Sequence, residues 1–543
     1  MNWHRGVGRS FAAAGLAMTI MVACSGSGDD RVTSPQLAGE QPLPQGGTIV
    51  IGAGEPVCAD WYAPCGAGNN AILVQHTLPA PMRFIDGQHR PTALLAGEPE
   101  VDPGPPHRVT YRVNPQAVWS DGTPITAADF RYSWEQGRAT NIRSMGDIAA
   151  VDDSDPRTAV VTWREPSGDW RDRFQPILPR HLLEGKDRNA EMKDGYRFSG
   201  GPWMLDHWTR GQEFKIVRNP RYWGKPAHLD GMVSRVADVP GNRQAFKTGQ
   251  MDMIMSPGAD ASIQEFKGMP DTAFEPIPSS GFSFFVFNTQ RPPFDRRPFR
   301  QALAYATDRD AIVAQLAGPI FPDARPTQAL ATAVIPEWYS EPFSRYRLDL
   351  TKVAELMRAE GWAKGPDGVW ARGDARARVE LSVSANVPFQ VLLAQIVESQ
   401  WKEAGFDAST RGIGATALLG DLVPKANYQV LFTGIGYPTD PSQCVRFCSD
   451  RIPTEANGFS GGNVSRIASP VLDDIWRQVD RELDRGKRRD LVRRGQEALA
   501  EELPAFPLSS IRDVAVYNST KLGGPVALTP PYAGLSDWFC KTT

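Results

Sequence analysis

The second half of the chain alternates short apolar strands with amphipathic helices, and this rhythm restricts the fold more than any other feature of the sequence. Strands are predicted where aromatic or β-branched residues cluster or alternate, and helices where apolar residues recur every three or four positions. Strands separated by helices imply α/β layers. The predicted strands are 282–288, 379–383 and 428–433, and the predicted helices carry Phe299, Leu303 and Ala306; Val353, Leu356 and Met357 behind an Asp349 cap; Leu393, Val397, Trp401 and Ala404; and Leu472, Ile475, Val479 and Leu483.

The loop after the predicted strand 428–433 is a candidate binding edge. In α/β sheets, ligands bind beyond the carboxyl ends of the strands. This loop, residues 434–441, reads GIGYPTDP. We therefore expect ligand contacts from Gly434 and the residues that follow it.

Five blocks of sequence occur in a fixed order along the chain. They are WSDGTPITAADF at 119–130, GPW at 201–203 with Trp208 and RNPRYWG at 218–224, GQMD at 249–252, FNT at 287–289 with PF at 293–294, and RQALAYATDR at 300–309. By these blocks the chain resembles the large solute-binding proteins of ABC importers, the family of the periplasmic oligopeptide- and dipeptide-binding proteins. The resemblance runs across nearly the whole chain after its N-terminal segment.

We interpret the residues of these blocks as determinants of the fold rather than as ligand contacts. Asp121 and Gly122 form a turn pair, and Thr126 and Asp308 are predicted helix N-caps. We expect Tyr222 and Trp223 to pack between strands rather than to contact a ligand.

The resemblance implies an α/β, periplasmic-binding-protein-like fold of the large three-domain type, with two lobes, a hinge and an interlobe cleft. Domain I is expected at 46–85, 195–275 and 505–543, domain II is an insertion at 86–194, and domain III is 276–504. Crossovers near 275 and 505 are the expected hinge. Such a protein encloses its ligand when the lobes close, and it needs no catalytic group.

The resemblance also suggests ligand-binding residues. In peptide-binding relatives an Asp four residues before a Pro pairs with the peptide's α-ammonium, and in this chain Tyr437 stands at that position. Either Asp440 takes over this contact, or the ligand lacks a free amine and Asp440 only caps a turn before Pro441. Tyr437 is then a candidate aromatic wall of the site.

Further candidates lie on two other segments. Trp61, Asn69 and Asn70 follow a short β-branched strand predicted at 47–52, where relatives edge the cleft, although the two Asn residues also suit a turn. Phe282 and Phe284 lie near the expected domain crossover, and core packing is the alternative for both.

The N-terminus predicts export and lipidation. Arg5 and Arg9 precede an apolar run of 13 residues, Phe11–Ala23, which is shorter than the ~20 residues of a membrane-spanning helix. The run ends in Met-Val-Ala followed by Cys24, similar to a bacterial lipobox. We expect 1–23 to be a signal peptide, Cys24 to be lipidated and 24–45 to be a flexible tether.

Five further cysteines are expected in an oxidising compartment, which favours disulfides. The local pairings that we favour are Cys58 with Cys65 and Cys444 with Cys448, and they leave Cys540 over. Sequence alone does not fix the connectivity.

Several function classes fit the sequence poorly. A net charge of −3 gives no case for nucleic acid binding, and the seven histidines form no metal-binding motif. The segment GFSGG at 458–462 matches the motif of a hydrolase nucleophile, but no strand is predicted before it. The basic run Arg485, Lys487, Arg488, Arg489, Arg493, Arg494 is interpreted as a solvated helix face, with a contact to a permease or to anionic headgroups as the alternative.

The expected function is therefore that of a monomeric, lipid-anchored receptor on the outer face of the plasma membrane, which passes oligopeptides to an ABC permease. The role requires no ATP, metal or cofactor on this chain. The alternatives are a binder of a glycoside, haem, a metal chelate or a signalling peptide, and a regulatory lipoprotein of the same fold that does not transport.

Overall fold

The computed structural model describes residues 43–52, 54–63, 71–140, 145–257, 261–331, 333–414, 417–436 and 439–541. All but the first of these residues belong to one compact unit, Pro44–Thr543. The signal peptide predicted at 1–23, the lipidated Cys24 and most of the predicted tether lie outside the described residues. Among the described helices none is long and apolar enough to cross a membrane.

A ten-stranded sheet connects the two ends of this unit. Its β16 is parallel to both β17 and β18, and β1 is parallel to both β10 and β11. The strands, in spatial order, are β17 (Asp407–Ile413), β16 (Arg378–Ser384), β18 (Val430–Ile435), β12 (Thr272–Phe287), β19 (Ala505–Asn518), β11 (Met253–Pro257), β1 (Thr48–Gly52), β10 (Gly231–Arg235), β9 (Glu213–Arg218) and β8 (Trp203–Thr209).

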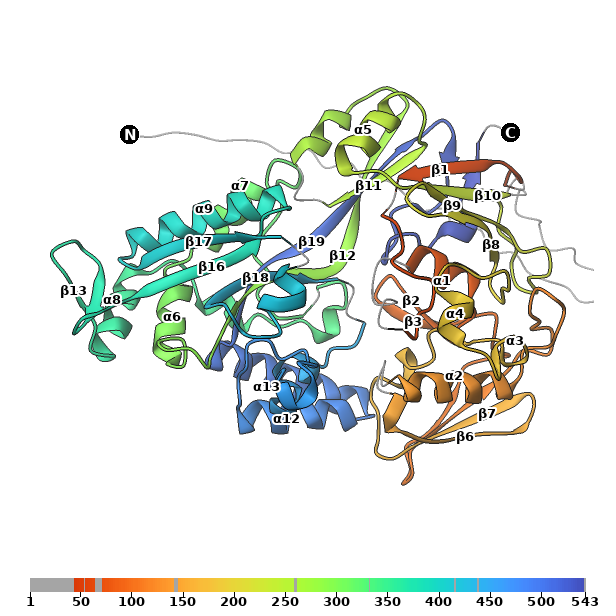
Figure 1. Cartoon of the computed structure of the whole chain (residues 1–543), viewed down its shortest axis with the longest axis horizontal. Coiled ribbons are helices and arrows are strands. Elements are labelled where there is room, and N and C mark those ends of the chain that lie inside the picture. Colours follow the sequence, from red (N-terminus) through yellow and green to blue (C-terminus); the bar gives the residue numbers. More distant parts are fainter. Residues whose placement is uncertain are drawn as a thin grey trace, which may run out of the picture. The chain divides into compact units, whose positions relative to one another are not determined.

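The two longest strands, β12 and β19, pair with each other and join two halves of the molecule (Figure 1). Strand β12 also pairs with β18, and strand β19 also pairs with β11. Their pairing is irregular between Ile277 and Gly281, close to the crossover predicted near 275. The crossover predicted near 505 coincides with the first residue of β19. The three-domain boundaries themselves stay a prediction.

Two large hydrophobic cores define two lobes on either side of these strands, and a third, smaller cluster, which includes Phe266, Phe321 and Val514, lies in addition to them. Lobe A has a core drawn from residues 49–277 and 515–540, and lobe B has a core drawn from residues 282–508. Phe84 of lobe A is the exception, because it packs into the core of lobe B.

Lobe A combines its part of the large sheet with a four-stranded sheet and short helices. The four-stranded sheet has the order β4 (Glu100–Asp102), β5 (Arg108–Arg112), β7 (Thr158–Trp163) and β6 (Ile148–Asp155). The remaining elements are β2 (Met82–Ile85), β3 (Gln88–Pro91), β20 (Leu522–Gly523), β21 (Phe539–Cys540), α1 (Ala71–Thr77), α2 (Ala127–Ala139), α3 (Arg180–Leu183), α4 (Arg188–Met192) and α5 (Val239–Lys247).

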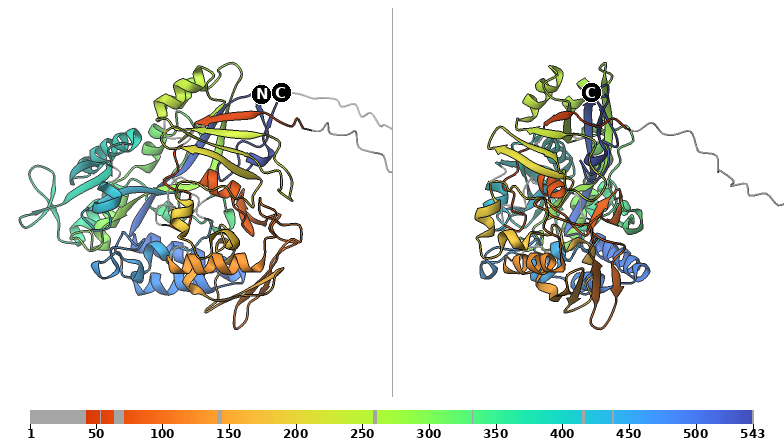
Figure 2. Two further views of the ribbon diagram at one scale, coloured as in Figure 1. Left: turned by 45° about the vertical axis from the view of Figure 1, so that its right-hand side comes forward. Right: turned by 90° about the vertical axis from the view of Figure 1, so that its right-hand side faces the viewer.

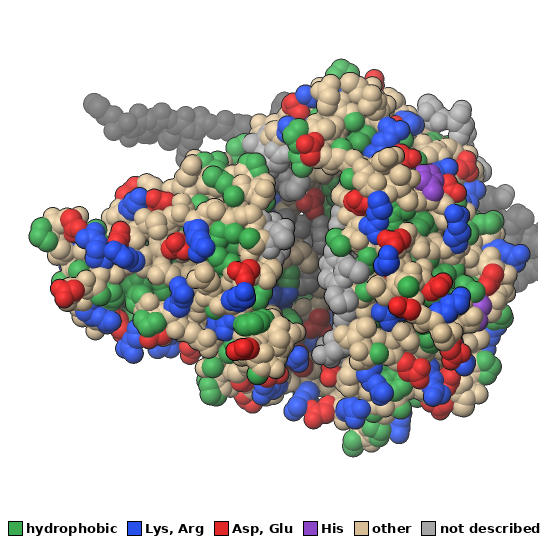
Figure 3. Space-filling view, viewed as in Figure 1, with side chains coloured by type: hydrophobic (Ala, Val, Ile, Leu, Met, Phe, Trp, Pro, Cys, Tyr) green, Lys and Arg blue, Asp and Glu red, His purple; other side chains and the backbone are tan. Residues whose placement is uncertain are grey.

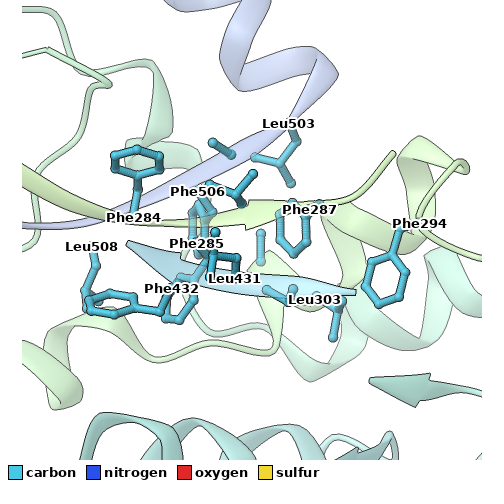
Figure 4. Packing of buried hydrophobic residues seen from close by; sticks show 14 of the residues in the cluster. Phe284, Phe285, Phe287, Phe294, Leu303, Leu431, Phe432, Leu503, Phe506 and Leu508 are labelled. Atoms are coloured by element: carbon cyan, nitrogen blue, oxygen red, sulfur yellow. The ribbon is translucent and has the colours of Figure 1, made fainter. Parts of the chain in front are cut away.

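Lobe B follows the strand–helix rhythm of the sequence and confirms the predicted α/β fold. Strand β12 is apolar on both faces because both are covered, so that Phe284 and Phe285 point to opposite sides and are both buried (Figure 4). The other elements are α6 (Arg297–Tyr305), α7 (Arg309–Leu316), α8 (Leu350–Ala359), α9 (Pro388–Glu403), α11 (Cys444–Phe447), α12 (Pro470–Arg481), α13 (Arg485–Glu502), β13 (Ala363–Lys364), β14 (Trp370–Arg372) and β15 (Ala375–Arg376).

One local prediction is wrong. Leu483 does not extend the stripe of α12, because the helix ends at Arg481, and Leu483 packs instead against the core of lobe A. Tyr222 and Trp223 lie in the connection between β9 and β10, and Trp223 packs, partly buried, against the core of lobe A.

Candidate functional site

A cavity of about 720 Å³ lies where lobe A faces lobe B. Lobe A contributes the segment 164–173, and lobe B contributes residues from the end of β18 to α12. The surface is hollowed between the elements of the two lobes (Figure 3). The volume lies within the ~300–1,000 Å³ range of small-molecule sites. The loop after β18, predicted as a binding edge, is thus part of this cavity wall.

A second cavity of about 300 Å³ adjoins the first one. The two share Asp169, Asp172, Thr439 and Asp440 as lining residues. The hydroxyl of Thr439 donates a hydrogen bond to Asp172 Oδ2 at 2.9 Å, and this bond joins the lobes between the two cavities. His89 Nε2 lies 2.9 Å from the other oxygen of Asp172 and fixes that carboxylate from the side of lobe A.

Arg488 of α13 bonds to residues of lobe B and also to lobe A. Its Nη1 and Nη2 lie 2.8 and 2.9 Å from the two carboxylate oxygens of Asp440, a bidentate ion pair. Nη1 also donates to the carbonyl oxygen of Gly168 in lobe A at 3.1 Å, and Nε donates to that of Val479 at 2.9 Å. Although burial lowers the pKa of this guanidinium, the facing Asp440 outweighs that effect and the pKa is raised.

Further bonds connect the same two segments. The Gly168 amide donates to the Asp480 carbonyl oxygen at 2.7 Å, and Arg481 Nε lies 2.6 Å from Glu165 Oε2. The views agree in placing α12 and α13 beside the part of lobe A that carries the four-stranded sheet (Figure 2). We call the contacts of Gly168, Asp172 and Glu165 with lobe B the interlobe latch.

Two side chains of the larger cavity lack a strong partner. Burial raises the pKa of Asp480 to about 6, and the neighbouring Asp169 and Asp440 raise it further while Ser442 and Arg488 oppose them. Burial lowers the pKa of Arg446 to about 10. In the described part of the chain, no carboxylate lies within 4.0 Å of the Arg446 guanidinium, which donates only to Gln443 Oε1 at 3.3 Å. The cavity therefore offers an acidic group and a basic group to a ligand.

The disulfide predicted between Cys444 and Cys448 is present and closes the single turn of α11 that carries Arg446. Cys540 is free and buried, while Cys58 is disulfide-bonded and its predicted partner Cys65 lies outside the described residues. Cys444, Cys448 and Asp450 form the one group of metal-ligand residue types found among the described residues, and its two sulfurs are bonded to each other.

The predicted ligand residues reach different places. Asp440 lines both cavities, but Arg488 already engages its carboxylate. Gly434 is exposed near the end of β18. Phe282 and Phe284 are 1% and 6% exposed and belong to the core of lobe B, and Trp61 packs partly buried against the core of lobe A. Asn69, Asn70 and Tyr437 lie outside the described residues. Their roles as ligand residues stay predictions.

Sequence reasoning missed Arg488, and the interpretation of the basic run as a solvated face is wrong at this position. Arg488 is 7% exposed. It stands four residues before Val492, which is followed by Gln496 and Leu499 on the buried stripe of α13. That spacing was the available signal, because a residue in phase with an apolar stripe faces the interior. Gly168 and Thr439 carried no comparable signal.

The motif at 458–462 lies in an irregular segment after a short 3-10 turn, with no strand before it. The structure therefore does not build a nucleophile elbow at Ser460.

Comparison with known proteins agrees with this geometry. Residues 91–450 match the model of the bacterial extracellular solute-binding proteins, family 5. The chain belongs to this family. It is therefore a solute-binding protein of an ABC transporter, not an enzyme; it acts outside the cytoplasm and delivers a small solute to a permease.

Three similar proteins illustrate the family. Protein XP55 of Streptomyces lividans is 25% identical over 510 residues, which cover 92% of this chain and 90% of that protein. The oligopeptide-binding protein OppA of Bacillus subtilis is 22% identical over 451 residues, covering 76% and 78%. The structure of a periplasmic EDTA-binding protein, EppA, superposes with a TM-score of 0.81 at 20% identity and covers 93% of this chain and 98% of its own. This structural similarity shows the fold of the chain, and that fold is the one predicted from the sequence.

Proposed function

We propose that this protein binds oligopeptides in the cavity between lobes A and B and delivers them to an ABC permease while anchored to the membrane through a lipid on Cys24. The cavity carries this proposal, because it is lined by both lobes and has a volume of about 720 Å³. A solute held there contacts both lobes, and only such a solute favours the closed arrangement over the open one.

The charges of the cavity suit a zwitterion. A peptide has an ammonium group at one end and a carboxylate at the other. Arg446 is available to the carboxylate, and Asp480 of lobe B and Asp172 of lobe A are acidic groups that line the same cavity. Asp440 is the weaker candidate for the ammonium, because a ligand would have to compete with its bidentate bond to Arg488. The similarity to a protein named for oligopeptide binding also supports a peptide ligand.

The first experiment identifies the natural ligand. The protein is purified without denaturation from the organism that makes it, and native mass spectrometry measures the mass of any bound molecule. Peptide masses are the expected result. A glycoside, haem or a metal chelate would contradict the peptide assignment and leave the solute-binding role intact.

The second experiment tests transport. Pools of random pentapeptides are titrated into the ligand-free protein by calorimetry, and peptide uptake is compared between cells with and without the gene. We expect saturable binding and lower uptake in the deletion strain. Binding with unchanged uptake would contradict delivery to a permease and favour a regulatory role.

A further inference from the structure

A third cavity, of about 320 Å³, is lined by residues of lobe A; one of them, Phe84, also lines the 300 Å³ cavity and packs into the core of lobe B, whereas none of them lines the 720 Å³ interlobe cavity. Its walls are the end of α1, the β2–β3 hairpin, the segment 200–202, the pair Tyr222 and Trp223, and residues near 533. Elements α1, β2 and β3 lie together in Figure 1. The charged residues of its described lining are Arg83 and Arg90, and no carboxylate is among them. The larger interlobe cavity, by contrast, mixes both signs of charge.

Arg83 is held in this cavity without an acidic partner. Its Nη2 donates to the carbonyl oxygens of Gln75 and Leu78, each at 2.9 Å. Burial lowers the pKa of its guanidinium to about 10. Within the described residues no carboxylate lies within 4.0 Å of it, whereas buried charges in proteins are usually paired. The guanidinium is thus fixed in position and still carries an uncompensated charge.

Two further polar groups at this cavity have no hydrogen-bond partner among the residues that the structure describes. The Nε2 atom of His76 is buried without a hydrogen bond, and the side chain is only 7% exposed. Burial and the nearby Arg83 lower the pKa of His76 to about 3, so the imidazole is neutral. Burial also raises the pKa of Tyr222, which keeps its hydroxyl protonated. No described residue accepts or donates a hydrogen bond at that hydroxyl. Arg83, Tyr222 and one tautomer of His76 are therefore unused hydrogen-bond donors.

The rest of the wall is apolar and aromatic. Tyr222 and Trp223 have ring centroids 5.0 Å apart at 47°, and Trp223 Nε1 donates to the Ala93 carbonyl oxygen at 2.8 Å. This bond fixes the indole in place. Leu78, Pro79 and Pro202 complete the apolar lining. Such a surface suits the flat, apolar body of a small molecule.

A purely structural role explains only part of this arrangement. Arg83 does bind two carbonyl oxygens at and beyond the end of α1, as a helix C-terminal cap does. One nitrogen serves that role. The capping role does not explain why the hydroxyl of Tyr222 and the buried nitrogen of His76 lack partners among the described residues, or why the lining contains two cations and no anion.

We propose that this cavity is a second binding site, separate from the interlobe site, for the carboxylate or phosphate group of a small molecule with a flat apolar body. The anion pairs with Arg83 and accepts hydrogen bonds from Tyr222 and His76, while the body packs on Tyr222 and Trp223. The proposal does not depend on the ligand of the interlobe cavity.

Calorimetric titration tests this site with four probes: benzoate, phenyl phosphate, benzamide and inorganic phosphate. We expect benzoate or phenyl phosphate to bind saturably and at least about tenfold more tightly than the uncharged benzamide, because a charge-assisted bond to the partly buried Arg83 discriminates by that much. Preference for benzoate identifies a carboxylate site, and preference for phenyl phosphate a phosphate site. Equal binding of benzamide, or the absence of saturation, would overturn the proposal.

Variants locate the binding. Arg83→Gln should weaken benzoate or phenyl phosphate by about tenfold or more, and Tyr222→Phe by a few-fold, because each removes one donor. Arg221→Gln is the matched control, since Arg221 is exposed next to Tyr222 and does not line the cavity. Tyr222→Phe keeps the ring and so remains informative if Arg83→Gln fails to fold.

Equal affinity in the wild type, Arg83→Gln and Tyr222→Phe would show an adventitious ion only. Binding that a saturating pentapeptide pool abolishes would place the probe in the interlobe cavity and refute a separate site.

Discussion

Arg488 and Gly168 are in contact across the two lobes: Arg488 Nη1 donates to the Gly168 carbonyl oxygen at 3.1 Å, and a β-carbon on Gly168 would lie 2.7 Å from the guanidinium. Arg488 cannot easily retreat, because the same guanidinium is bonded to Asp440 and to the Val479 carbonyl oxygen. The closeness of the lobes at this point thus depends on the absence of a side chain at residue 168.

Gly168→Ala should therefore weaken the interlobe latch. We expect a larger radius of gyration by solution scattering and an affinity for the pentapeptide pool that is lower by about tenfold, the effect of losing one or two hydrogen bonds to a charged group. Gly146→Ala is the matched control, since a β-carbon there meets nothing within 4 Å. Identical scattering and affinity in Gly168→Ala and the wild type would show that the latch does not hold the lobes together.

The elements of lobe B could be predicted from the sequence because local chemistry specifies them. Asp308 and Asp349 each precede a helix of lobe B as expected and accept hydrogen bonds from the amides of Ala311 and Lys352, and Thr126 precedes α2 of lobe A in the same way. The stripe of Leu393, Val397 and Trp401 is buried as its spacing indicates. Patterns of this kind are properties of neighbouring residues.

The latch and the cavities could not be predicted because they join residues that are distant in the sequence. Gly168 meets Arg488, and Asp172 meets Thr439, only after β12 and β19 have brought the lobes together. Asp440 was a candidate for contact with a ligand amine, and nothing in its neighbourhood in the sequence indicated that Arg488 would engage it. The fold therefore followed from local patterns, whereas the pairing of charges at the site required the structure.

Asp480 should make stability depend on pH. Its pKa is raised from 3.8 to about 6 in the folded protein, chiefly by burial. Between these values the folded state binds a proton that the unfolded state has released, so this residue favours folding at acidic pH and ceases to do so as the pH rises through about 6.

Asp480→Asn should therefore be more stable than the wild type at pH 7.5, by about 1–3 kcal/mol, and about equally stable near pH 4. Urea unfolding at several pH values measures this difference. Asp474→Asn controls for the substitution itself, because Asp474 is exposed on the same helix. A stability difference that does not change with pH would refute the assignment.

Arg446 should select for a carboxylate within the interlobe cavity. Arg446→Gln is expected to lower the affinity for pentapeptides with a free C-terminus by about tenfold, and to leave the affinity for C-terminally amidated pentapeptides nearly unchanged. Arg477→Gln is the matched control, since Arg477 lines the same cavity but is paired with Asp450 at 2.9 Å. If Arg446→Gln weakens both pools equally, Arg446 acts on the shape of the cavity and not on a ligand carboxylate.

Cys24 should determine where the protein resides. If residues 1–23 are removed and Cys24 is diacylated, two acyl chains hold the protein stably on the membrane, whereas a single chain does not. We expect the wild type in the membrane fraction, with an intact mass that corresponds to residues 24–543 plus the lipid. Cys24→Ala should release the protein from the membrane without changing its binding of pentapeptides. Cys540→Ala is the control: it replaces a free, buried cysteine and should remain on the membrane. Recovery of Cys24→Ala in the membrane fraction would contradict lipidation at Cys24.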